Sequence, residues 1–251
     1  MTLQKFFDEN PRLALAFSGG CDSAYLLWAA VEAGADVQPY FVKTVFQPAF
    51  ELEDARRLCA ELKRPLKVLE LELLSQPLIA ANSPQRCYHC KRRLMEALRS
   101  AAAEDGYPLL IDGTNASDSS GDRPGMAALA ELGVRYPLRE AGLEKADVRR
   151  LSAEAGLFTA DKPAYACLAT RIPTGKAIDA SALAVIEQAE SLLAAMGYSN
   201  FRVRLRDYGA LLQFEQGQLE RAGEDFANIC GCLGEMFREL RLDPEPRRKG
   251  D

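Results

Sequence analysis

The chain has 251 residues, of which 48% are hydrophobic and 27% charged, which excludes a disordered or fibrous protein and predicts one large domain or two modest ones. Its 31 Lys and Arg against 36 Asp and Glu give a net charge of −5, which argues against a nucleic-acid partner. No apolar run reaches the roughly 18 residues of a membrane span and no signal peptide opens the chain. We therefore expect a cytoplasmic protein with no membrane partner.

Cysteine is the most informative residue type, because the chain has seven Cys and one His. Disulfides contribute little in a cytoplasmic chain, so a thiol-rich, imidazole-poor composition predicts thiolate chemistry or a sulfur-ligated metal. The alternative is that most thiols pack as small apolar side chains. We expect packing for Cys59, Cys230 and Cys232, which lie in helix-like stretches without a partner at ligand spacing.

Strand and helix patterns alternate through the first part of the chain. Strand-length apolar runs occur at 13–17, 37–42, 65–71 and 109–111. Helical patterns occur at 24–30, 51–62, 92–103 and 125–132, and a stretch at 134–138 leads to a helix at about 144–155. This spacing predicts an α/β fold with a parallel sheet and helices on both of its faces.

The pattern changes near Lys162 and Pro163. Residues 163–175 show neither helical nor alternating periodicity, and their Pro and Gly indicate a structured loop or linker. The remainder predicts a helix at 180–196, strands at 201–205 and 210–214, a long helix to about residue 240 with no further strand, and a frayed tail at 244–251. We predict two domains, 1–160 and 161–251, the second a smaller α+β domain.

The strongest local signal is the sequence Ser-Gly-Gly-Cys-Asp-Ser at 18–23, between the first strand and its helix. Two consecutive glycines let backbone amides turn toward an anion, and the helix N-terminus adds partial positive charge. The hydroxyls of Ser18 and Ser23 can complete this cradle. The loop has neither the Lys of a Walker A motif nor a G-x-G-x-x-G fingerprint. The alternative is a glycine-rich turn with Asp22 as a helix cap.

This loop resembles that of the pyrophosphate-loop ATPases, which cleave ATP between its α and β phosphates and adenylate a substrate oxygen. The resemblance implies an adenine nucleotide alpha hydrolase-like domain that uses ATP and Mg²⁺. It also implies that the residues that grip pyrophosphate are Ser18, Gly19, Gly20, Asp22 and Ser23. Cys21 falls at the variable position of the motif and is predicted to be filler.

Two further patterns indicate ligand contacts. The sequence Asp-Gly-Thr-Asn at 112–115 follows a buried strand, so it lies at the carboxyl edge where open α/β sheets bind ligands. We predict that Thr114 contacts ATP; the alternative is an ordinary Asx-rich turn. Arg202, Arg204 and Arg206 alternate along a predicted strand, which places three guanidiniums on one face, suited to phosphate or carboxylate. The alternative is a solvated strand face.

A second constellation is the C-x-x-C sequence at 87–90, a spacing that brings two thiolates within reach of one ion, as in metal and redox sites. No second C-x-x-C or His pair completes a zinc site, and His89 is predicted to be a solvated loop residue. The candidate third ligand is Cys167, in a Pro-rich loop beside Lys162 and Arg171, whose charges would favour its thiolate. Three cysteines can hold a [4Fe-4S] cluster by three corners and leave the fourth iron open.

Together these motifs resemble the LarE family of sulfur transferases, which build the nickel-pincer nucleotide cofactor of lactate racemase. The resemblance extends from residue 13 to about residue 215. The ordered motifs that carry it lie at 17–23, 86–91, 112–115, 122–125 with 133–138, 162–163 with 167–173, and 202–204. Many ATPases share the loop alone, whereas the ordered set is far more specific.

Members of this family adenylate a carboxylate of pyridinium-3,5-biscarboxylic acid mononucleotide and then replace AMP by sulfur. One subtype uses a single cysteine, which matches Cys167, as a sacrificial donor that becomes dehydroalanine. Another subtype also carries the C-x-x-C, and its three cysteines bind an iron-sulfur cluster that delivers sulfide. Because Cys87, Cys90 and Cys167 are all present, the resemblance favours the cluster subtype for this chain.

The resemblance thus implies an adenylating, ATP-dependent sulfurtransferase with a small nucleotide substrate and a tendency to self-associate. The catalytic residues it implies are Cys167, Cys87, Cys90 and Lys91. Those implied to bind the substrate are Arg171, Arg202 and Arg204, with Lys91 and Arg171 placed to stabilise charge on phosphates or on a developing oxyanion. The alternatives are another amidase or tRNA thiolase of the same loop group and a non-catalytic zinc- or nucleotide-binding module.

Overall fold

The computed structural model describes residues 1–118 and 124–247 of the chain. It divides into two units: unit 1 is Met1–Leu73 with Gln85–Lys162, and unit 2 is Leu74–Pro84 with Pro163–Asp251. Asp122 and Arg123 of the predicted motif at 122–125, and positions 248–251 of the predicted tail, lie outside the described residues. None of the described helices is both long enough and apolar enough to cross a membrane.

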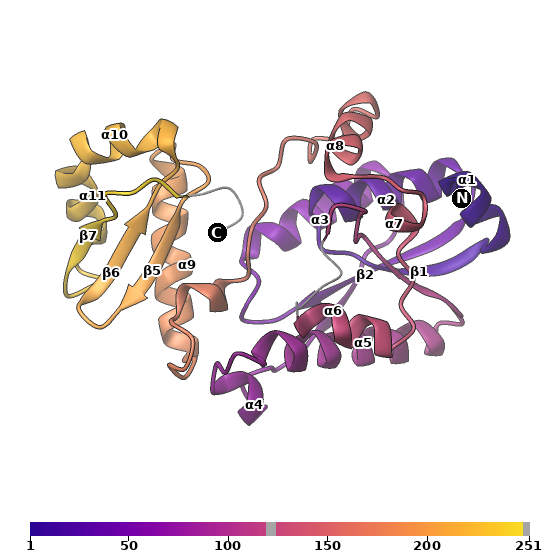
Figure 1. Cartoon of the computed structure of the whole chain (residues 1–251), viewed down its shortest axis with the longest axis horizontal. Helices are drawn as coiled ribbons and strands as arrows, with labels where there is room; N and C mark the ends of the chain where they lie inside the picture. The colour runs from indigo at the N-terminus through magenta and orange to yellow at the C-terminus, as the bar shows by residue number, and fades with distance from the viewer. Residues whose placement is uncertain (119–123, 248–251) are drawn as a thin grey trace. The chain divides into compact units, whose positions relative to one another are not determined.

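Parallel strands form the centre of unit 1 (Figure 1). In the order β3-β2-β1-β4 they are Lys67–Glu70, Asp36–Lys43, Arg12–Ala16 and Leu110–Asp112. The predicted stretch at 134–138 adds a single bridge, between Arg135 and Ile111, and then turns into the short helix α7 (Pro137–Glu140). The described sheet therefore has four strands in the positions that the alternating pattern predicts.

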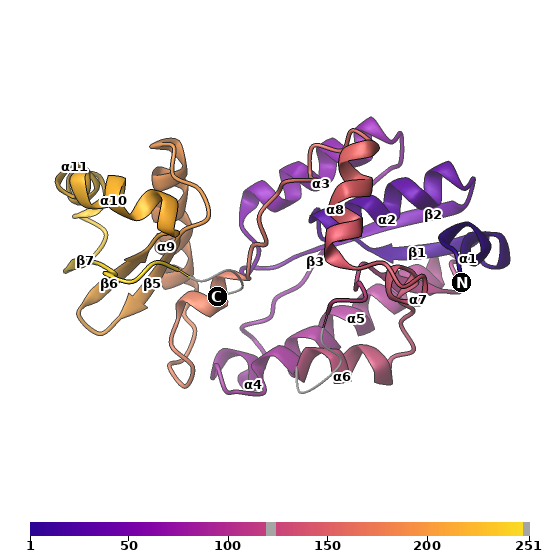
Figure 2. The same ribbon diagram turned by 45° about the horizontal axis from the view of Figure 1, so that its top comes forward.

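Helices cover both faces of this sheet (Figures 1 and 2). One face carries α2 (Cys21–Glu32), α3 (Ala49–Glu61) and α8 (Lys145–Glu154), with α1 (Leu3–Glu9) at its margin, and the other carries α5 (Arg86–Glu104) and α6 (Pro124–Glu131). In β1, Leu13 and Leu15 enter the first core, whereas Ala14 and Ala16 enter the second, because side chains alternate along a strand. The predicted adenine nucleotide alpha hydrolase-like fold is confirmed.

The strand order reverses at β1. From β1 the chain passes to β2 and β3 on one side, and it then crosses over to β4 on the other side. The segments that follow β1 and β4 therefore meet at the carboxyl edge of the sheet, where ligands bind in open α/β sheets. These segments are the glycine loop at 18–23 and the sequence at 112–115.

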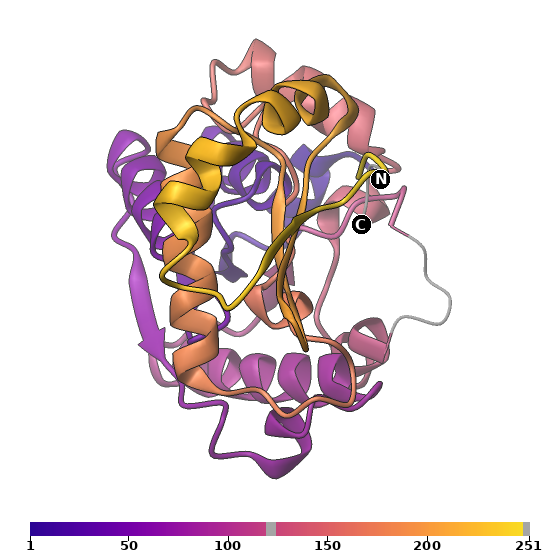
Figure 3. The ribbon, with the colours of Figure 1, turned by 90° about the vertical axis from the view of Figure 1, so that its left-hand side faces the viewer.

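Unit 2 contains a small mixed sheet, as the smaller α+β domain predicted (Figure 3). Strand β5 (Arg202–Arg206) pairs antiparallel with β6 (Gly209–Gln213), which pairs in parallel with β7 (Leu240–Leu242). Helix α9 (Ala180–Ala195) packs along β5, and α10 (Gln216–Glu224) and α11 (Phe226–Leu233) follow β6. The prediction of one long helix to about residue 240 without a further strand is therefore wrong.

The reason for this error is a contact that local patterns do not encode. Ala210 donates its N–H to the carbonyl of Glu239 at 2.9 Å, which starts the pairing of β6 with β7. A Cβ at Gly209 would lie 2.1 Å from that carbonyl oxygen, so the approach requires glycine at this position. With three residues, β7 is too short to show a period of its own.

Residues 74–84, inside the range predicted for the first domain, belong to unit 2. They include the short helix α4 (Pro77–Ala80). The side-chain amide of Asn82 donates to the carbonyls of Pro173 at 2.9 Å and Lys176 at 3.0 Å, and Gly175 returns a backbone bond to Asn82. Hydrogen bonds to carbonyls that lie 91 and 94 positions further along the chain therefore hold residues 74–84 in unit 2.

Candidate functional site

The glycine loop presents uncapped amides at the start of α2. Its N-cap residue, Gly20, is extended and has no side chain to bond the first turn, so these N–H groups can bind an anion. The hydroxyl oxygens of Ser18 and Ser23 lie 3.0 Å apart, and Ser18 donates its N–H to Ser23 Oγ at 3.3 Å. Asp22 lies inside the first helical turn, so the alternative of Asp22 as the cap is wrong.

The segment after β4 packs directly against this loop. A Cβ at Gly113 would lie 2.8 Å from the backbone nitrogen of Ser23 and 3.1 Å from its Cα. The neighbouring Thr114 is buried and donates both its N–H, at 2.8 Å, and its hydroxyl to Asp112. The predicted ATP-contact residue Thr114 is thus next to the glycine loop, held by the last residue of β4.

Replacing Gly113 by Ala should weaken ATP binding by about tenfold or more, because the added methyl group displaces either the start of α2 or the loop at 112–115. The measurement is the dissociation constant for ATP by isothermal titration calorimetry. Gly217→Ala is the control, since a Cβ there meets no atom of the described residues within 4 Å and should leave the constant unchanged. Tight ATP binding by Gly113→Ala would contradict the close packing.

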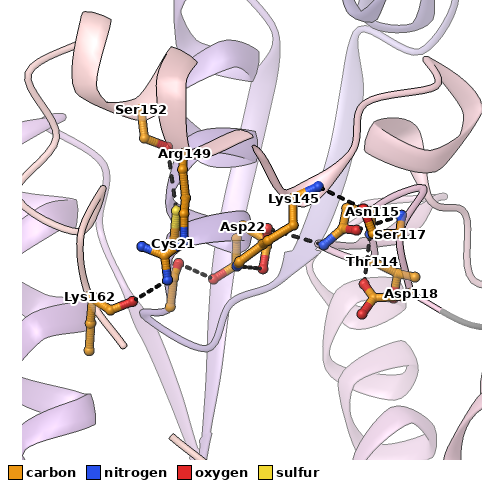
Figure 4. Close-up of polar contacts among 12 residues, drawn as sticks. Cys21, Asp22, Thr114, Asn115, Ser117, Asp118, Lys145, Arg149, Ser152 and Lys162 are labelled. Carbon is orange, nitrogen blue, oxygen red and sulfur yellow. Dashed lines mark hydrogen bonds and ion pairs between the residues drawn. The ribbon is translucent and has the colours of Figure 1, made fainter. Parts of the chain in front are cut away.

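Asp22 is held by side chains from two other segments (Figure 4). Lys145 Nζ lies 2.5 Å from Asp22 Oδ2, and Asn115 Nδ2 donates to Asp22 Oδ1 at 3.3 Å. The backbone N–H of Lys145, the first residue of α8, donates to Ser117 Oγ at 3.0 Å. Sequence analysis missed Lys145 because α8 reads as an ordinary amphipathic helix with no motif around it.

The C-x-x-C pair lies in the first two turns of α5, in the same unit as the glycine loop. Cys87 is exposed and Cys90 half-buried. The next residue, Lys91, places its ammonium 3.9 Å from Asp112 Oδ2 at the end of β4. Because Asp112 is followed by Gly113, which touches the start of α2, the helix that carries the two thiols lies at the same edge of the sheet as the loop.

The other cysteines divide by burial, and none of the seven forms a disulfide. Cys59 is buried, and burial raises the pKa of its thiol to about 12, so the packing prediction holds there. Cys21 is also buried, with its sulfur 3.6 Å from Ser152 Oγ. Cys230 is half-buried, but Cys232 is exposed, so the packing prediction is wrong for Cys232.

Two further predictions concern metal ligands. His89 lies half-buried within α5, so its placement in a loop is wrong. Over residues 1–118 and 124–247, no group of three or more His, Cys, Asp or Glu side chains is gathered closely enough to hold a metal ion. Cys87 and Cys90 belong to unit 1 and Cys167 to unit 2.

In unit 2, a buried ion pair holds the segment that carries Cys167. This cysteine is half-buried at the start of the 3-10 helix η1 (Leu168–Arg171). Arg171 is 0% exposed and donates from Nε and Nη2 to the two carboxylate oxygens of Glu190 at 2.8 and 3.1 Å. Its Nη1 donates to the carbonyl of Ala166 at 2.8 Å, next to Cys167. The Arg171 guanidinium therefore fixes the backbone around the thiol.

Glu190, which sequence analysis missed, connects three segments of unit 2. Besides Arg171, its carboxylate accepts bonds from the hydroxyl of Tyr165 and, at 3.0 Å, from the N–H of Val203 in β5. It thereby joins α9, the segment with Cys167, and β5. A single Glu in a helix with an apolar face carries no sequence signal of this role.

The two predicted arginines of β5 turn into the same region. Arg202 is 3% exposed and donates to the carbonyls of Phe201 at 2.6 Å and Ala164 at 3.1 Å. Among the described residues its buried Nε has no hydrogen-bond partner. Burial, with the charges of Arg171 and Arg247, lowers the pKa of Arg202 to about 10. Arg204 donates to the carbonyl of Thr170 at 3.0 Å and to Gln213.

Comparison with known proteins identifies the family of this chain. No protein-family model matches it. An uncharacterized protein of Synechocystis sp. is 33% identical over 242 residues, which are 95% of this chain and 88% of the relative. The pyridinium-3,5-bisthiocarboxylic acid mononucleotide synthase of Lactiplantibacillus plantarum is 30% identical over 220 residues, 87% of this chain and 80% of the relative. The chain belongs to the LarE family.

A more distant relative places this LarE-family protein among the pyrophosphate-loop ATPases. The tRNA-specific 2-thiouridylase of Rhizobium johnstonii is 26% identical over 289 aligned positions, which span 96% of this chain and 68% of the relative. The resemblance to the LarE family and to pyrophosphate-loop ATPases is confirmed, and the protein is an ATP-dependent sulfurtransferase.

Proposed function

We propose that this LarE-family protein uses ATP to adenylate a carboxylate of pyridinium-3,5-biscarboxylic acid mononucleotide and converts it to a thiocarboxylate for nickel-pincer cofactor synthesis. The relative from L. plantarum is named for the bisthiocarboxylic acid product of such a reaction. The structural observation that carries the proposal is the meeting of three segments at the carboxyl edge of the sheet in unit 1. There the glycine loop, the segment at 112–115 and the C-x-x-C helix α5 lie together.

The first proposed step makes the carboxylate electrophilic. A substrate carboxylate oxygen attacks the α-phosphorus of ATP, the bond from phosphorus to the bridging oxygen breaks, and pyrophosphate leaves. The uncapped amides at the start of α2 and the hydroxyls of Ser18 and Ser23 would stabilise the charge that builds up on pyrophosphate. Mg²⁺ would be held mainly by the phosphates, and Asp22 is the carboxylate that the loop itself offers.

In the second proposed step, a sulfur nucleophile attacks the acyl carbon, the bond to the AMP oxygen breaks, and AMP leaves. Lys91, beside Asp112, would offset negative charge at the carboxyl edge of the sheet. Arg202 and Arg204 would hold the substrate's phosphate or second carboxylate. This role is supported by the buried Nε of Arg202, which has no hydrogen-bond partner among the described residues, and by the lowered pKa of this guanidinium. A buried guanidinium short of countercharge gains from binding an anion.

We propose further that Cys87, Cys90 and Cys167 hold a [4Fe-4S] cluster by three thiolates. The chemistry of the donors supports this, since three thiolates suit such a cluster, two thiols without a disulfide stand one turn apart on α5 and a third directly precedes η1. When bound, such a cluster supplies a sulfide nucleophile. In the alternative, the Cys167 thiolate attacks the acyl carbon to give a thioester. Removal of the Cys167 Cα proton then breaks its Cβ–S bond, leaving the thiocarboxylate and dehydroalanine.

The test combines ATP-pyrophosphate exchange with iron and sulfide analysis of anaerobically purified protein. We expect exchange that depends on the pyridinium substrate, a thiocarboxylate product by mass spectrometry, and iron and sulfide in the protein. Conversion of Cys167 to dehydroalanine in an iron-free protein would establish the sacrificial route. Exchange stimulated by tRNA would indicate a tRNA thiolase, and bound zinc without any exchange a non-catalytic module. Sedimentation of the same preparation tests the self-association that family resemblance implies.

A further inference from the structure

Lys162, the last residue of unit 1, reaches back to the glycine loop. Its ammonium donates to the carbonyl oxygen of Gly19 at 3.1 Å and to Asp54 Oδ2 of α3 at 2.6 Å. The side chains of Lys162 and Asp54 are only 14% and 30% exposed. This is therefore a largely desolvated ion pair set against the backbone of the loop, whereas exposed pairs in proteins contribute little.

The bond to Gly19 fixes the orientation of a whole peptide group. In a planar trans peptide the carbonyl oxygen of Gly19 and the N–H of Gly20 point in opposite directions, so a cation on that oxygen directs the N–H away from Lys162. On that side the N–H donates to Ser18 Oγ at 3.4 Å, one of the hydroxyls of the loop. Gly19 has φ +70°, and a Cβ there would lie 3.0 Å from the carbonyl oxygen of Glu51 and 3.3 Å from Ala55 Cβ. Helix α3 therefore limits how far the loop can move, and Lys162 opposes rotation of its peptide.

The backbone of Lys162 is anchored as firmly as its side chain. Arg149 of α8 donates to the carbonyls of Ala160 at 2.7 Å and Lys162 at 3.0 Å, and the N–H of Lys162 donates to Thr159 at 3.1 Å (Figure 4). Both the backbone and the ammonium of Lys162 are therefore held by neighbouring segments. This lowers the conformational entropy that Lys162 loses when its side chain bonds the loop.

We propose that Lys162 is a positioning residue that holds the Gly19–Gly20 peptide in its anion-binding orientation, and that Asp54 keeps Lys162 in place. The proposal concerns the pyrophosphate loop alone, so it can be tested with inorganic pyrophosphate whatever carboxylate the protein uses. Failure of the proposed substrate would therefore be seen separately.

The competing role, in which Lys162 leaves Asp54 and binds phosphate directly, predicts the opposite effect of one substitution. Asp54→Asn removes the countercharge of Lys162. If Lys162 contacts phosphate itself, this change frees the cation and tightens pyrophosphate binding. If Lys162 acts by positioning the loop, the change loosens its anchor and weakens binding. The sign of the Asp54→Asn effect therefore decides between the two roles.

The experiment measures pyrophosphate affinity of the full chain by isothermal titration calorimetry with Mg²⁺ present. We expect Lys162→Met to weaken binding by about tenfold and Asp54→Asn by about threefold or more, in line with the loss of a charge-assisted hydrogen bond. Tighter binding by Asp54→Asn, or affinities of both variants within about twofold of the wild type, would overturn the proposal.

A matched control exists on the same unit. Lys67 and Asp105 form an ion pair with the same 2.6 Å distance, but Lys67 begins β3 and its ammonium donates to Asp105 rather than to the loop. Lys67→Met should bind pyrophosphate like the wild type. Lys162→Arg keeps the positive charge and should retain most of the affinity. If Lys162→Met fails to fold, as judged by circular dichroism, the Asp54→Asn and Lys162→Arg variants still give the deciding comparison.

Discussion

Replacing Cys167 by Ala should abolish thiocarboxylate formation, a loss of at least about a thousandfold, as expected when a reacting group is removed. ATP-pyrophosphate exchange should stay within about twofold of the wild type, because adenylation uses the loop at 18–23 and precedes the step that needs the Cys167 sulfur. The two activities are measured on the same preparation, by mass spectrometry of the product and by isotope exchange. Thiocarboxylate formation at the wild-type rate would contradict the role proposed for Cys167.

Two further cysteine variants show whether the effect of Cys167→Ala is specific to this thiol and which sulfur route is used. Cys232→Ala removes an exposed thiol from the same unit and should leave both activities unchanged. Cys87→Ala then separates the two sulfur routes. If a cluster supplies the sulfide, Cys87→Ala should lose iron, sulfide and sulfur transfer together. If Cys167 is the donor, Cys87→Ala should still transfer one sulfur per chain.

Replacing Glu190 by Gln should destabilise unit 2 by about 3–5 kcal/mol, because it leaves the buried guanidinium of Arg171 without its countercharge. Burial alone would lower the pKa of Arg171, and its hydrogen bonds to Glu190 reverse that effect and raise it. The segment at 163–175 should lose hydrogen-exchange protection first, since Arg171 and Tyr165 tie it to Glu190. Calorimetry and hydrogen exchange with mass spectrometry measure the two effects.

Two comparisons separate the contribution of Glu190 to the stability of unit 2 from its role in positioning the Cys167 segment. Glu220→Gln makes the same chemical change at an exposed site of α10 and should alter neither stability nor exchange. The double variant Arg171→Leu, Glu190→Leu should recover part of the stability, because it removes both buried charges. It should not recover sulfur transfer, since the hydrogen bond from Arg171 to the carbonyl of Ala166 is gone. Full stability of Glu190→Gln would show that the carboxylate is not needed.

The fold of unit 1 could be predicted from the sequence because its signals are local. Alternating apolar runs and helices indicate a parallel sheet, and two glycines between a strand and a helix indicate an anion loop, whatever the rest of the chain does. The strands, α2 and α3 were predicted in this way. The short strand β7 was not, because its pairing depends on Glu239 approaching Gly209.

The candidate site divides in the same way. The residues that sequence motifs identified are Ser18, Ser23, Lys91 and the three candidate cysteines, since each stands in a local pattern of residue types. Lys145, Asp54 and Glu190 stand in helices that look ordinary, and their partners lie 123, 108 and 19 positions away along the chain. No local pattern distinguishes such residues from surface charges.

By itself, then, the sequence determined the class of fold, the anion-binding loop and the bias toward sulfur chemistry. Each of these depends on residues that are close together in the sequence. Only the tertiary structure decided which charges serve that loop. Folding brings Lys145 to Asp22, and it brings Lys162 to Gly19. It also buries Arg171, a predicted substrate contact, against Glu190, where Arg171 donates to the carbonyl next to Cys167. Such pairings depend on which elements pack together, and this is fixed by the whole core rather than by neighbours in sequence.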